Sequence, residues 1–189
     1  MHRQRGISLV VVTAIVMLAT PLVAATVVST GSASVSSGQT FTVPVSIADV
    51  SDLFAFQFDL TFDPAILQLQ SISEGGFLPS AGSTIFVPGT IDNTAGTATT
   101  TADTLTGPGP GASGGGTLAD LNFQAIAPGT SALTLSVVIL LNSAGGDISP
   151  FTTSNGSVTV GAAAVPEPSG LSWIGAFALA AALRLRKAA

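Results

Sequence analysis

Hydrophobic and polar residues alternate along most of the middle of the chain, and glycine-rich breaks separate the alternating runs. The clearest run is Leu53–Phe62, in which Phe or Leu occupies every second position from Phe54 onward. Successive side chains of a strand point to opposite faces of its sheet, so this run predicts a strand with five large side chains in a core. A row of sugar-stacking rings is the other interpretation. An exposed row of that size would promote aggregation, which favours the core.

The same alternation predicts further strands on both sides of this run. They are Phe41–Ile47, Gln68–Ile72, Ser83–Pro88, Thr90–Asp92, Gly96–Ala102, Thr117–Ile126, Leu133–Leu141 and Ser157–Val160, and the odd-numbered residues of Leu133–Leu141 are expected to share one face. Asp63-Pro64 predicts a tight turn, and the glycine-rich segment Gly107–Gly116 predicts a loop. Seven to nine strands without a long helical pattern indicate an all-β fold, an antiparallel jelly-roll or Greek-key β-sandwich.

The start of the chain is basic and then apolar. Arg3 and Arg5 precede the run Ile7–Ala25, which ends in small residues. This layout is typical of a secretory signal peptide, and Ala25 is the predicted last residue of a signal helix over 1–25. An uncleaved membrane anchor is the alternative, because the run is nearly long enough to span a bilayer.

The end of the chain mirrors the start. The apolar run Leu171–Leu183 is followed by the basic residues Arg184, Arg186 and Lys187. A helix over 171–183 is about 20 Å long, whereas the hydrocarbon core of a bilayer is roughly 30 Å thick. Arginine side chains that reach the membrane surface and local thinning of the bilayer make up part of the difference. We therefore expect a short transmembrane helix and a transient membrane association, with a buried amphipathic helix as the alternative. The positive-inside rule keeps both basic ends cytoplasmic, so the middle is expected to be exported.

Charge separates the middle of the chain from its ends. The 189 residues carry a formal net charge of -5, and all five Lys and Arg residues lie within six residues of an end. Between Gly6 and Leu183 there are ten acidic residues and no basic one, and the chain has no Cys and no Tyr. Such a middle excludes Ser-His-Asp and Cys-His catalysis, Schiff-base chemistry, and zinc sites of Cys or His. It also excludes nucleic-acid binding, which needs positive charge against phosphate.

Carboxylate chemistry is what remains. Asp49 and Asp52 lie in a predicted turn, where together with Ser51 they offer oxygen ligands for calcium (Ca²⁺), the one cofactor that the pattern admits. An Asx turn is the alternative explanation. Asp92, Asp103 and Asp147 border loops and are further oxygen donors whose relative placement the sequence does not give.

Enzyme activity is not expected from this composition. A glycoside hydrolase needs two carboxylates across a cleft, and the acidic residues are scattered with no pair indicated. The middle also has no Trp and no Tyr, the rings on which sugar sites usually depend. We assign no catalytic, cofactor-binding or metal-binding residue from the sequence.

A short proline motif precedes the C-terminal apolar run: Val165-Pro166-Glu167-Pro168. The motif, the apolar run and the arginine-rich end together resemble the PEP-CTERM sorting signal. The resemblance implies recognition by an exosortase, after export by the secretion machinery, in a Gram-negative bacterium that makes exopolysaccharide. Two prolines favour extended backbone and keep the motif out of the following helix, which suits a protease substrate. A rigid linker before a membrane anchor is the alternative.

Several short segments carry a second resemblance. They are Val43-Pro44-Val45, Phe56–Pro64 with Leu67, Gly116–Phe123, Gly129–Leu133 and Gly156–Val160. In their order along the chain and in their amino-acid sequence they resemble the cohesin domain, a jelly-roll sandwich related to some carbohydrate-binding modules. Cohesins of cellulosomes hold the dockerin modules of enzymes, whereas this chain has a single module without repeats or a catalytic neighbour. The resemblance therefore implies the fold more directly than it implies the partner.

These observations predict an exported protein of the cell surface or extracellular matrix. It comprises a signal peptide over 1–25, a cohesin-like sandwich over 26–161 and a sorting segment over 162–189. The sandwich is expected to be a non-catalytic binding or structural module whose partner is a surface protein or extracellular polysaccharide. A lectin-like module acting on exopolysaccharide is the alternative, followed by a carboxylate-based glycoside hydrolase.

Overall fold

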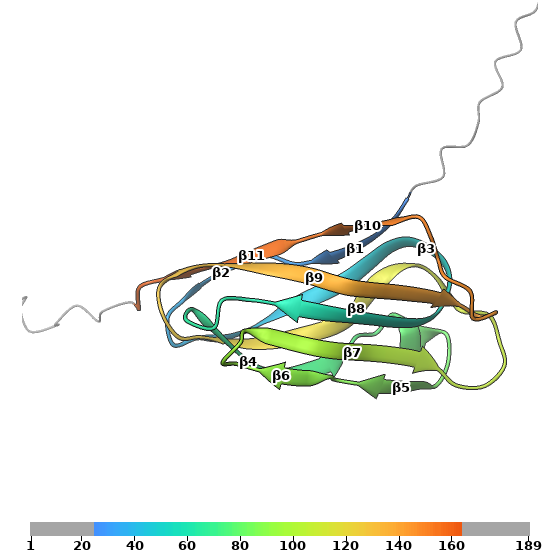
Figure 1. Cartoon of the computed structure of the whole chain (residues 1–189), viewed down its shortest axis with the longest axis horizontal. Helices are drawn as coiled ribbons and strands as arrows, with labels where there is room; N and C mark the ends of the chain where they lie inside the picture. Colours follow the sequence, from blue (N-terminus) through green and yellow to red (C-terminus); the bar gives the residue numbers. More distant parts are fainter. Residues whose placement is uncertain (1–24, 164–189) are drawn as a thin grey trace, which may run out of the picture.

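The structure is a computed structural model that describes residues 25–163 (Figure 1). Most of the predicted signal peptide, the motif Val165–Pro168, the apolar run 171–183 and the basic residues Arg184, Arg186 and Lys187 lie outside the described residues. Over the described stretch, no helix has the length and hydrophobicity needed to cross a bilayer.

Strands make up nearly all of the described chain, as the alternating pattern predicts. They are β1 (Thr26–Thr30), β2 (Ala33–Ser36), β3 (Thr40–Thr61), β4 (Leu67–Glu74), β5 (Thr84–Val87), β6 (Thr90–Asp92), β7 (Thr97–Leu105), β8 (Ala112–Ala125), β9 (Gly129–Asn142), β10 (Phe151–Ser154) and β11 (Gly156–Gly161), with one short 3-10 helix, η1 (Leu78–Ser80). The all-β sandwich is confirmed, with eleven strands in the described residues in place of seven to nine. The extra strands β1, β2 and β10 are short and polar, so they lack a run of large alternating residues.

Two layers of strands share the long strand β3. Its first half pairs with β1 and β8, and β4 and β10 extend that layer at its two edges. Its second half pairs with β7 and β9, and β5, β6, β11 and β2 extend the other layer. Most pairs are antiparallel, but β1 with β10 and β2 with β11 are parallel. Hydrogen bonding therefore runs continuously from one layer to the other through β3.

The strand β3 changes layers at a stretch where its buried side chains are three residues apart. Buried residues alternate regularly before Ile47 and after Phe56, whereas Val50 and Leu53 lie between them at steps of three. Two residues of this stretch have left-handed backbone, Asp49 at φ 55° and Asp52 at φ 61°. Extra residues of this kind bend a strand and increase its twist. The turn predicted at 48–52 is thus wrong, because this stretch is a bulged part of a continuous strand.

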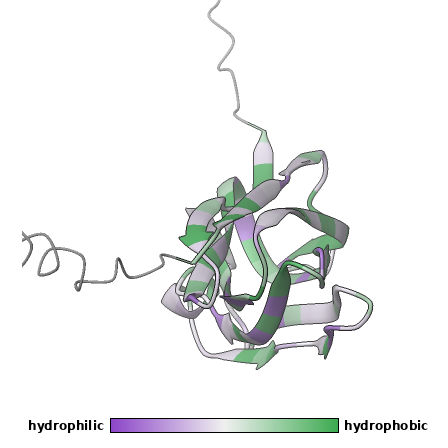
Figure 2. Ribbon diagram, turned by 90° about the vertical axis from the view of Figure 1, so that its left-hand side faces the viewer, coloured by the Kyte–Doolittle hydropathy of each residue, from purple (hydrophilic) through white to green (hydrophobic). Residues whose placement is uncertain are grey.

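Aromatic and branched side chains fill the space between the layers. In the view along the long axis, hydrophobic bands alternate with pale, weakly polar bands along several ribbons (Figure 2). Phe123 on β8 lies at the centre of an aromatic cluster, with its ring centroid 5.8 Å from that of Phe41 and 5.4 Å from that of Phe62. Phe58 on β3 is 1% exposed, and its ring stacks beside Phe56. The core interpretation of the phenylalanine row is confirmed.

The glycine-rich segment after β7 differs from its prediction. Gly107–Gly111 is a loop as expected, but β8 already begins at Ala112 and runs through Gly114–Gly116. The glycines are needed there because this backbone passes very close to the bulged part of β3. A Cβ atom on Gly111 would lie 2.5 Å from the Leu53 carbonyl oxygen, and one on Gly115 would lie 2.8 Å from the Ile47 carbonyl oxygen.

The strand β9 also departs from simple alternation. Leu133 and Leu135 are buried as predicted, but Val137 adopts φ 48° and the face then changes. Val137 is 57% exposed and Ile139 is 40% exposed, whereas Leu140 is buried. The expectation that the odd-numbered residues share one face is wrong beyond Leu135, because a bulge adds a residue against β3.

The aromatic cluster yields a stability prediction. Replacing Phe123 with Ala removes a side chain that is 1% exposed and contacts two other rings, and should lower the free energy of unfolding by about 3–5 kcal/mol. Urea denaturation of residues 25–163 measures this loss. The matched control is Ile126→Ala, whose side chain is 45% exposed, with an expected change within about 0.5 kcal/mol. Equal losses in the two variants would contradict the placement of Phe123.

Candidate functional site

The outer face of the β5–β7–β3–β9 layer presents a regular array of uncharged side chains. The strand registers place one residue of each strand in each of two rows: Ile85, Thr104, Ala55 and Leu141 in the first, and Val87, Ala102, Gln57 and Ile139 in the second. We call this set the eight-residue face. Alternation predicts the outward direction of Ala55 and Gln57. The pairing that brings four strands together is not readable from the sequence.

The eight-residue face is hollow along its middle. The central strands β3 and β7 contribute the small Ala55 and Ala102 together with Thr104 and Gln57, whereas large aliphatic residues stand on the outer strands β5 and β9. All eight residues line one depression of about 310 Å³, with Phe56 and Asp103 also at its floor. The two alanines therefore lie lower than the aliphatic side chains of β5 and β9, which makes a groove that follows the strands.

The face is also unusually apolar for a protein surface. Five large hydrophobic residues are exposed among those described: Ile85, Val87, Ile126, Val137 and Ile139. Three of them belong to the eight-residue face and Val137 lies next to it on β9, so only Ile126 lies elsewhere. Scattered exposed hydrophobic residues are normal, but a gathered patch of this kind marks an interaction surface.

The outer face of the opposite layer has a different character. There Thr42 of β3 donates to the Asn122 side chain at 2.8 Å, and Asn122 donates to Ser71 at 3.2 Å. Gln70 of β4 donates to Gln124 of β8 at 2.9 Å. These side chains bond to one another in a polar ladder, which leaves the eight-residue face as the apolar side of the sandwich.

Two bulges bound the eight-residue face at the same level of β3. Thr100 of β7 has φ 59°, and its N–H donates to the Asp59 carboxylate at 2.7 Å. Val137 of β9 has φ 48° on the other side of β3. The register of both neighbouring strands shifts next to Phe58 and Asp59, so the regular array ends there.

The two aspartates considered as calcium ligands have separate surroundings. Asp52 ties three segments together: one carboxylate oxygen accepts the Gly111 N–H at 2.6 Å, and the other accepts the Ser143 hydroxyl at 2.7 Å. Its own N–H donates to the Ser113 hydroxyl. Asp49 is exposed and contributes its backbone carbonyl, which accepts the Thr26 hydroxyl. N–H and O–H donors thus occupy the Asp52 carboxylate. Both donors lie far from Asp52 in the chain, and residues 48–52 belong to a continuous strand, so the Asx-turn alternative is wrong for Asp52.

These contacts shift two pKa values. The Gly111 N–H, followed by the Ser143 hydroxyl, lowers the pKa of Asp52 below its ordinary value. The N–H groups of Ala95 and Thr94 lower the pKa of Asp92, which closes the turn between β6 and β7. Both carboxylates therefore hold loops in their ionised form. Among residues 25–163, no three acidic or histidine side chains gather into a metal-binding group.

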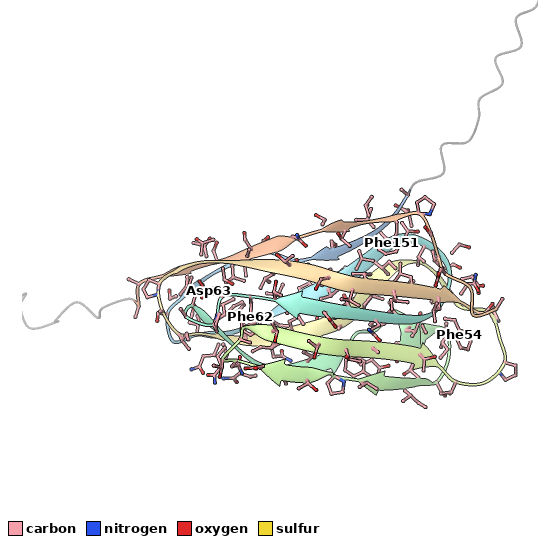
Figure 3. The ribbon with its side chains drawn as sticks, in the orientation of Figure 1. Phe54, Phe62, Asp63 and Phe151 are labelled. Carbon is pink, nitrogen blue, oxygen red and sulfur yellow. The ribbon has the colours of Figure 1, made fainter. Side chains whose placement is uncertain are left out.

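The phenylalanines of the run Leu53–Phe62 do not form a sugar-binding surface. Phe56, Phe58 and Phe62 are buried, and Phe54 is half-buried against the core. Figure 3 shows Phe62, next to Asp63, and Phe54 toward opposite ends of the molecule. Asp63 forms the predicted turn, since its carboxylate accepts the Ala65 N–H at 2.9 Å. Every phenylalanine among the described residues is buried or half-buried.

A comparison with protein-family models identifies the fold's family. The model of the cohesin domain matches residues 26–160. The chain belongs to the cohesin-domain family. A cohesin domain is a non-catalytic module for protein–protein binding, which agrees with a middle that has no Cys, His, Lys or Arg. No curated protein sequence matches the chain.

Solved cohesins resemble the chain over nearly their whole length. A cohesin of Clostridium acetobutylicum, CaCohA2, is 27% identical at a TM-score of 0.56, over 75% of this chain and 94% of that one. A non-cellulosomal cohesin of the archaeon Archaeoglobus fulgidus is 20% identical at a TM-score of 0.59, over 73% and 92%. The third ScaC cohesin of Acetivibrio cellulolyticus, solved with the ScaB dockerin, is 21% identical at 0.59, over 71% and 98%. The described residues thus correspond to one complete cohesin module.

The contacts of Asp52 lead to a prediction for the variant Asp52→Asn. The variant Asp49→Asn is compared with it, because both residues have left-handed backbone. Asp52→Asn removes the charge that accepts the Gly111 and Ser143 donors, so the melting temperature at pH 7 should fall by a few degrees. Asparagine tolerates the same backbone, and Asp49→Asn at φ 55° is the matched control with no expected change.

The pH dependence of this effect has a definite sign. The lowered pKa of Asp52 means that its contribution is present above its ordinary value of 3.8 and is lost as the pH falls through the folded-state pKa. Thermal melts from pH 7 to pH 2 should therefore show the two curves, wild type and Asp52→Asn, converging in acid. A constant difference at all pH values would contradict the role given to the ionised carboxylate.

Proposed function

We propose that this protein is an exported docking module that binds a protein partner through the eight-residue face. The observation that carries the proposal is the apolar groove between Ile85 and Val87 on one side and Ile139 and Leu141 on the other. The opposite outer face satisfies its polar groups internally and offers no comparable surface. A dockerin-bearing protein is the partner class, because the family is that of cohesins and related cohesins are solved with dockerins.

The dimensions of the groove favour a helix as the bound element. Neighbouring strands lie about 4.8 Å apart, so the ridges on β5 and β9 are separated by three strand spacings, or about 14 Å. An α-helix with its side chains is about 10–12 Å across, so a helix lying along the strands could contact both ridges and place its side chains over Ala55 and Ala102. Apolar positions spaced three and four apart on that helix would fill the hollow, as in other helix-in-groove complexes.

A glycan is a weaker candidate for the same groove. Sugar sites commonly rely on exposed aromatic rings, and the described residues present none. The eight-residue face also carries only two polar side chains, Thr104 and Gln57, for hydrogen bonding to hydroxyl groups. The polysaccharide-binding alternative therefore receives less support than a protein partner.

The docking proposal predicts the effect of a charge placed in the groove. Ile139→Asp should weaken partner binding at least tenfold, because a partner's apolar side chain would have to bury an unpaired carboxylate. Ile126→Asp is the control, since Ile126 is 45% exposed but lies off this face, and it should bind as the wild type does. The proteins of the producing bacterium's culture fluid are the probe, captured on immobilised 25–163 and identified by mass spectrometry. Capture that is equal on all three proteins would contradict docking at this face.

The two ends support a proposal about delivery. Arg3, Arg5 and the apolar run to Ala25 fit a cleaved signal peptide, which would place the sandwich outside the cytoplasm. Val165–Pro168, the run 171–183 and the basic end fit a sorting segment read by an exosortase of a Gram-negative cell. The mature protein would then begin at Thr26 and reside at the cell surface or in the extracellular matrix, free of the membrane after processing.

Processing can be tested in the producing bacterium. Changing Pro166, Glu167 and Pro168 together to alanine should leave export intact and hold the protein in the membrane fraction, because the protease would lose its recognition site. Immunoblots of membrane and culture fluid measure the distribution, and intact mass of released protein reports both ends. Ser169→Ala is the neighbouring control and should be released normally. Release of the triple variant at the wild-type level would rule out sorting through this motif.

A further inference from the structure

A buried carboxyl group lies directly behind the eight-residue face. Asp103 sits on β7 between Ala102 and Thr104, which point outward, so its own side chain points between the layers. It is 2% exposed, and its register partners on β3 and β5 are Phe56 and Phe86. Neither of its carboxylate oxygens has a hydrogen-bond partner of normal geometry, and the nearby Thr104 N–H offsets only part of the effect of burial on the pKa of Asp103.

A second carboxyl group comes from the opposite layer. Glu74 is the last residue of β4, and its carboxylate lies close enough to Asp103 for a side-chain hydrogen bond once one of the two holds a proton. Thr84 at the start of β5 donates its hydroxyl to Glu74. Oxygen atoms of three strands therefore converge at one place between the layers.

Nothing in the described chain balances this charge. Residues 25–163 contain no Lys, Arg or His, so no side-chain cation can pair with the two carboxylates. An unpaired buried carboxylate costs several kcal/mol, and two facing each other cost more. Burial, followed by the charge of Glu74, accordingly raises the pKa of Asp103 to about 6. A cation bound from solution would balance this charge at neutral pH.

We propose that Asp103, Glu74 and Thr84 bind a calcium ion that joins the two layers behind the eight-residue face. Calcium prefers carboxylate and neutral oxygen ligands in flexible geometry, and these three side chains offer up to five such oxygens. Glu74 is only half-buried, so water can reach the site and complete the coordination. This site is distinct from the exposed Asp49 and from Asp52, whose carboxylate accepts the Gly111 N–H and the Ser143 hydroxyl.

The calcium site would act on the eight-residue face through its edge strand. Thr84 begins β5, whose Ile85 and Val87 form one ridge of the groove, and Asp103 lies on the neighbouring strand β7. An ion held by both strands and by Glu74 would fix this ridge against the rest of the sandwich. The binding of calcium itself does not depend on the proposed docking function.

Thermal melts of residues 25–163 at pH 7.5 test the site, in EDTA, in CaCl₂ and in MgCl₂. The cohesin-domain match spans residues 26–160, so this fragment contains the domain. Calcium should raise the melting temperature by several degrees over EDTA, and isothermal titration calorimetry should give one ion per chain. Asp103→Asn should abolish both responses while raising the melting temperature in EDTA, because the isosteric amide removes the buried charge. Glu74→Gln should abolish both responses as well.

Asp49→Asn serves as the matched control, because it removes one exposed carboxylate elsewhere and should keep the calcium response. Two results would overturn the proposal. In the first, the wild type shows no calcium response at pH 7.5 and merely becomes more stable as the pH falls through about 6, which assigns the charge balance to a proton. In the second, the response survives Asp103→Asn and is lost in Asp49→Asn, which places the ion at the bulged part of β3.

Discussion

The passage of β3 between the two layers is the constraint on which the rest of the fold depends. Four strands pair with β3 directly, and the others pair with those four or with their neighbours. A single strand can pair in both layers only if its backbone bends between them while side chains at regular intervals stay buried in the core. The three-residue spacing from Ile47 through Val50 and Leu53 to Phe56 achieves this, with left-handed backbone at Asp49 and Asp52. Aspartate is among the few residue types that tolerate this conformation.

The same constraint explains residues that looked functional in the sequence. Asp52 holds the bulged stretch by accepting the Gly111 and Ser143 donors, and the glycines of Gly111–Gly116 let β8 approach it closely. Asp52 and these glycines therefore stabilise and accommodate the stretch in which β3 passes from one layer to the other. The proposed binding surface lies past the crossing, where β3 alternates regularly again and presents Ala55 and Gln57 to solvent.

The sequence is informative wherever large side chains alternate, and β3 from Phe54 onward is the clearest case. Alternation predicts the core direction of Phe56, Phe58 and Phe62 because burial on one face has a fixed period of two. Alternation does not predict the bulges at Asp52 and Val137. A single inserted residue shifts which positions face the core, but it leaves the kinds of residue in the strand unchanged. The strand segment Ala112–Gly116 was predicted as a loop for a related reason. Its glycines are required by the close approach of β3, which is distant in the sequence.

The candidate site was harder to predict than the fold. Ile85 and Val87 lie in a short strand with little pattern of its own, and Ile139 follows a bulge that reverses its face. Their meeting with Ala55 and Ala102 depends on the registers of four strands. Asp103 was visible as an acidic residue near a loop, but its burial against Glu74 requires the two layers to be stacked.

The placement of the chain's two ends determines how the module would carry tension. The described chain begins at β1 and ends after β11, at opposite ends of the long axis (Figure 1). A pull applied at Gly161 enters β11, which has five register pairs with β9 and four with β2. That pull runs along the strands. It therefore loads all of these hydrogen bonds at the same time in shear, whereas a pull across the strands would open them one by one. The force then passes along β9, the strand that also carries Ile139 and Leu141, so a tether at the C-terminal end and a partner on the groove would share one strand.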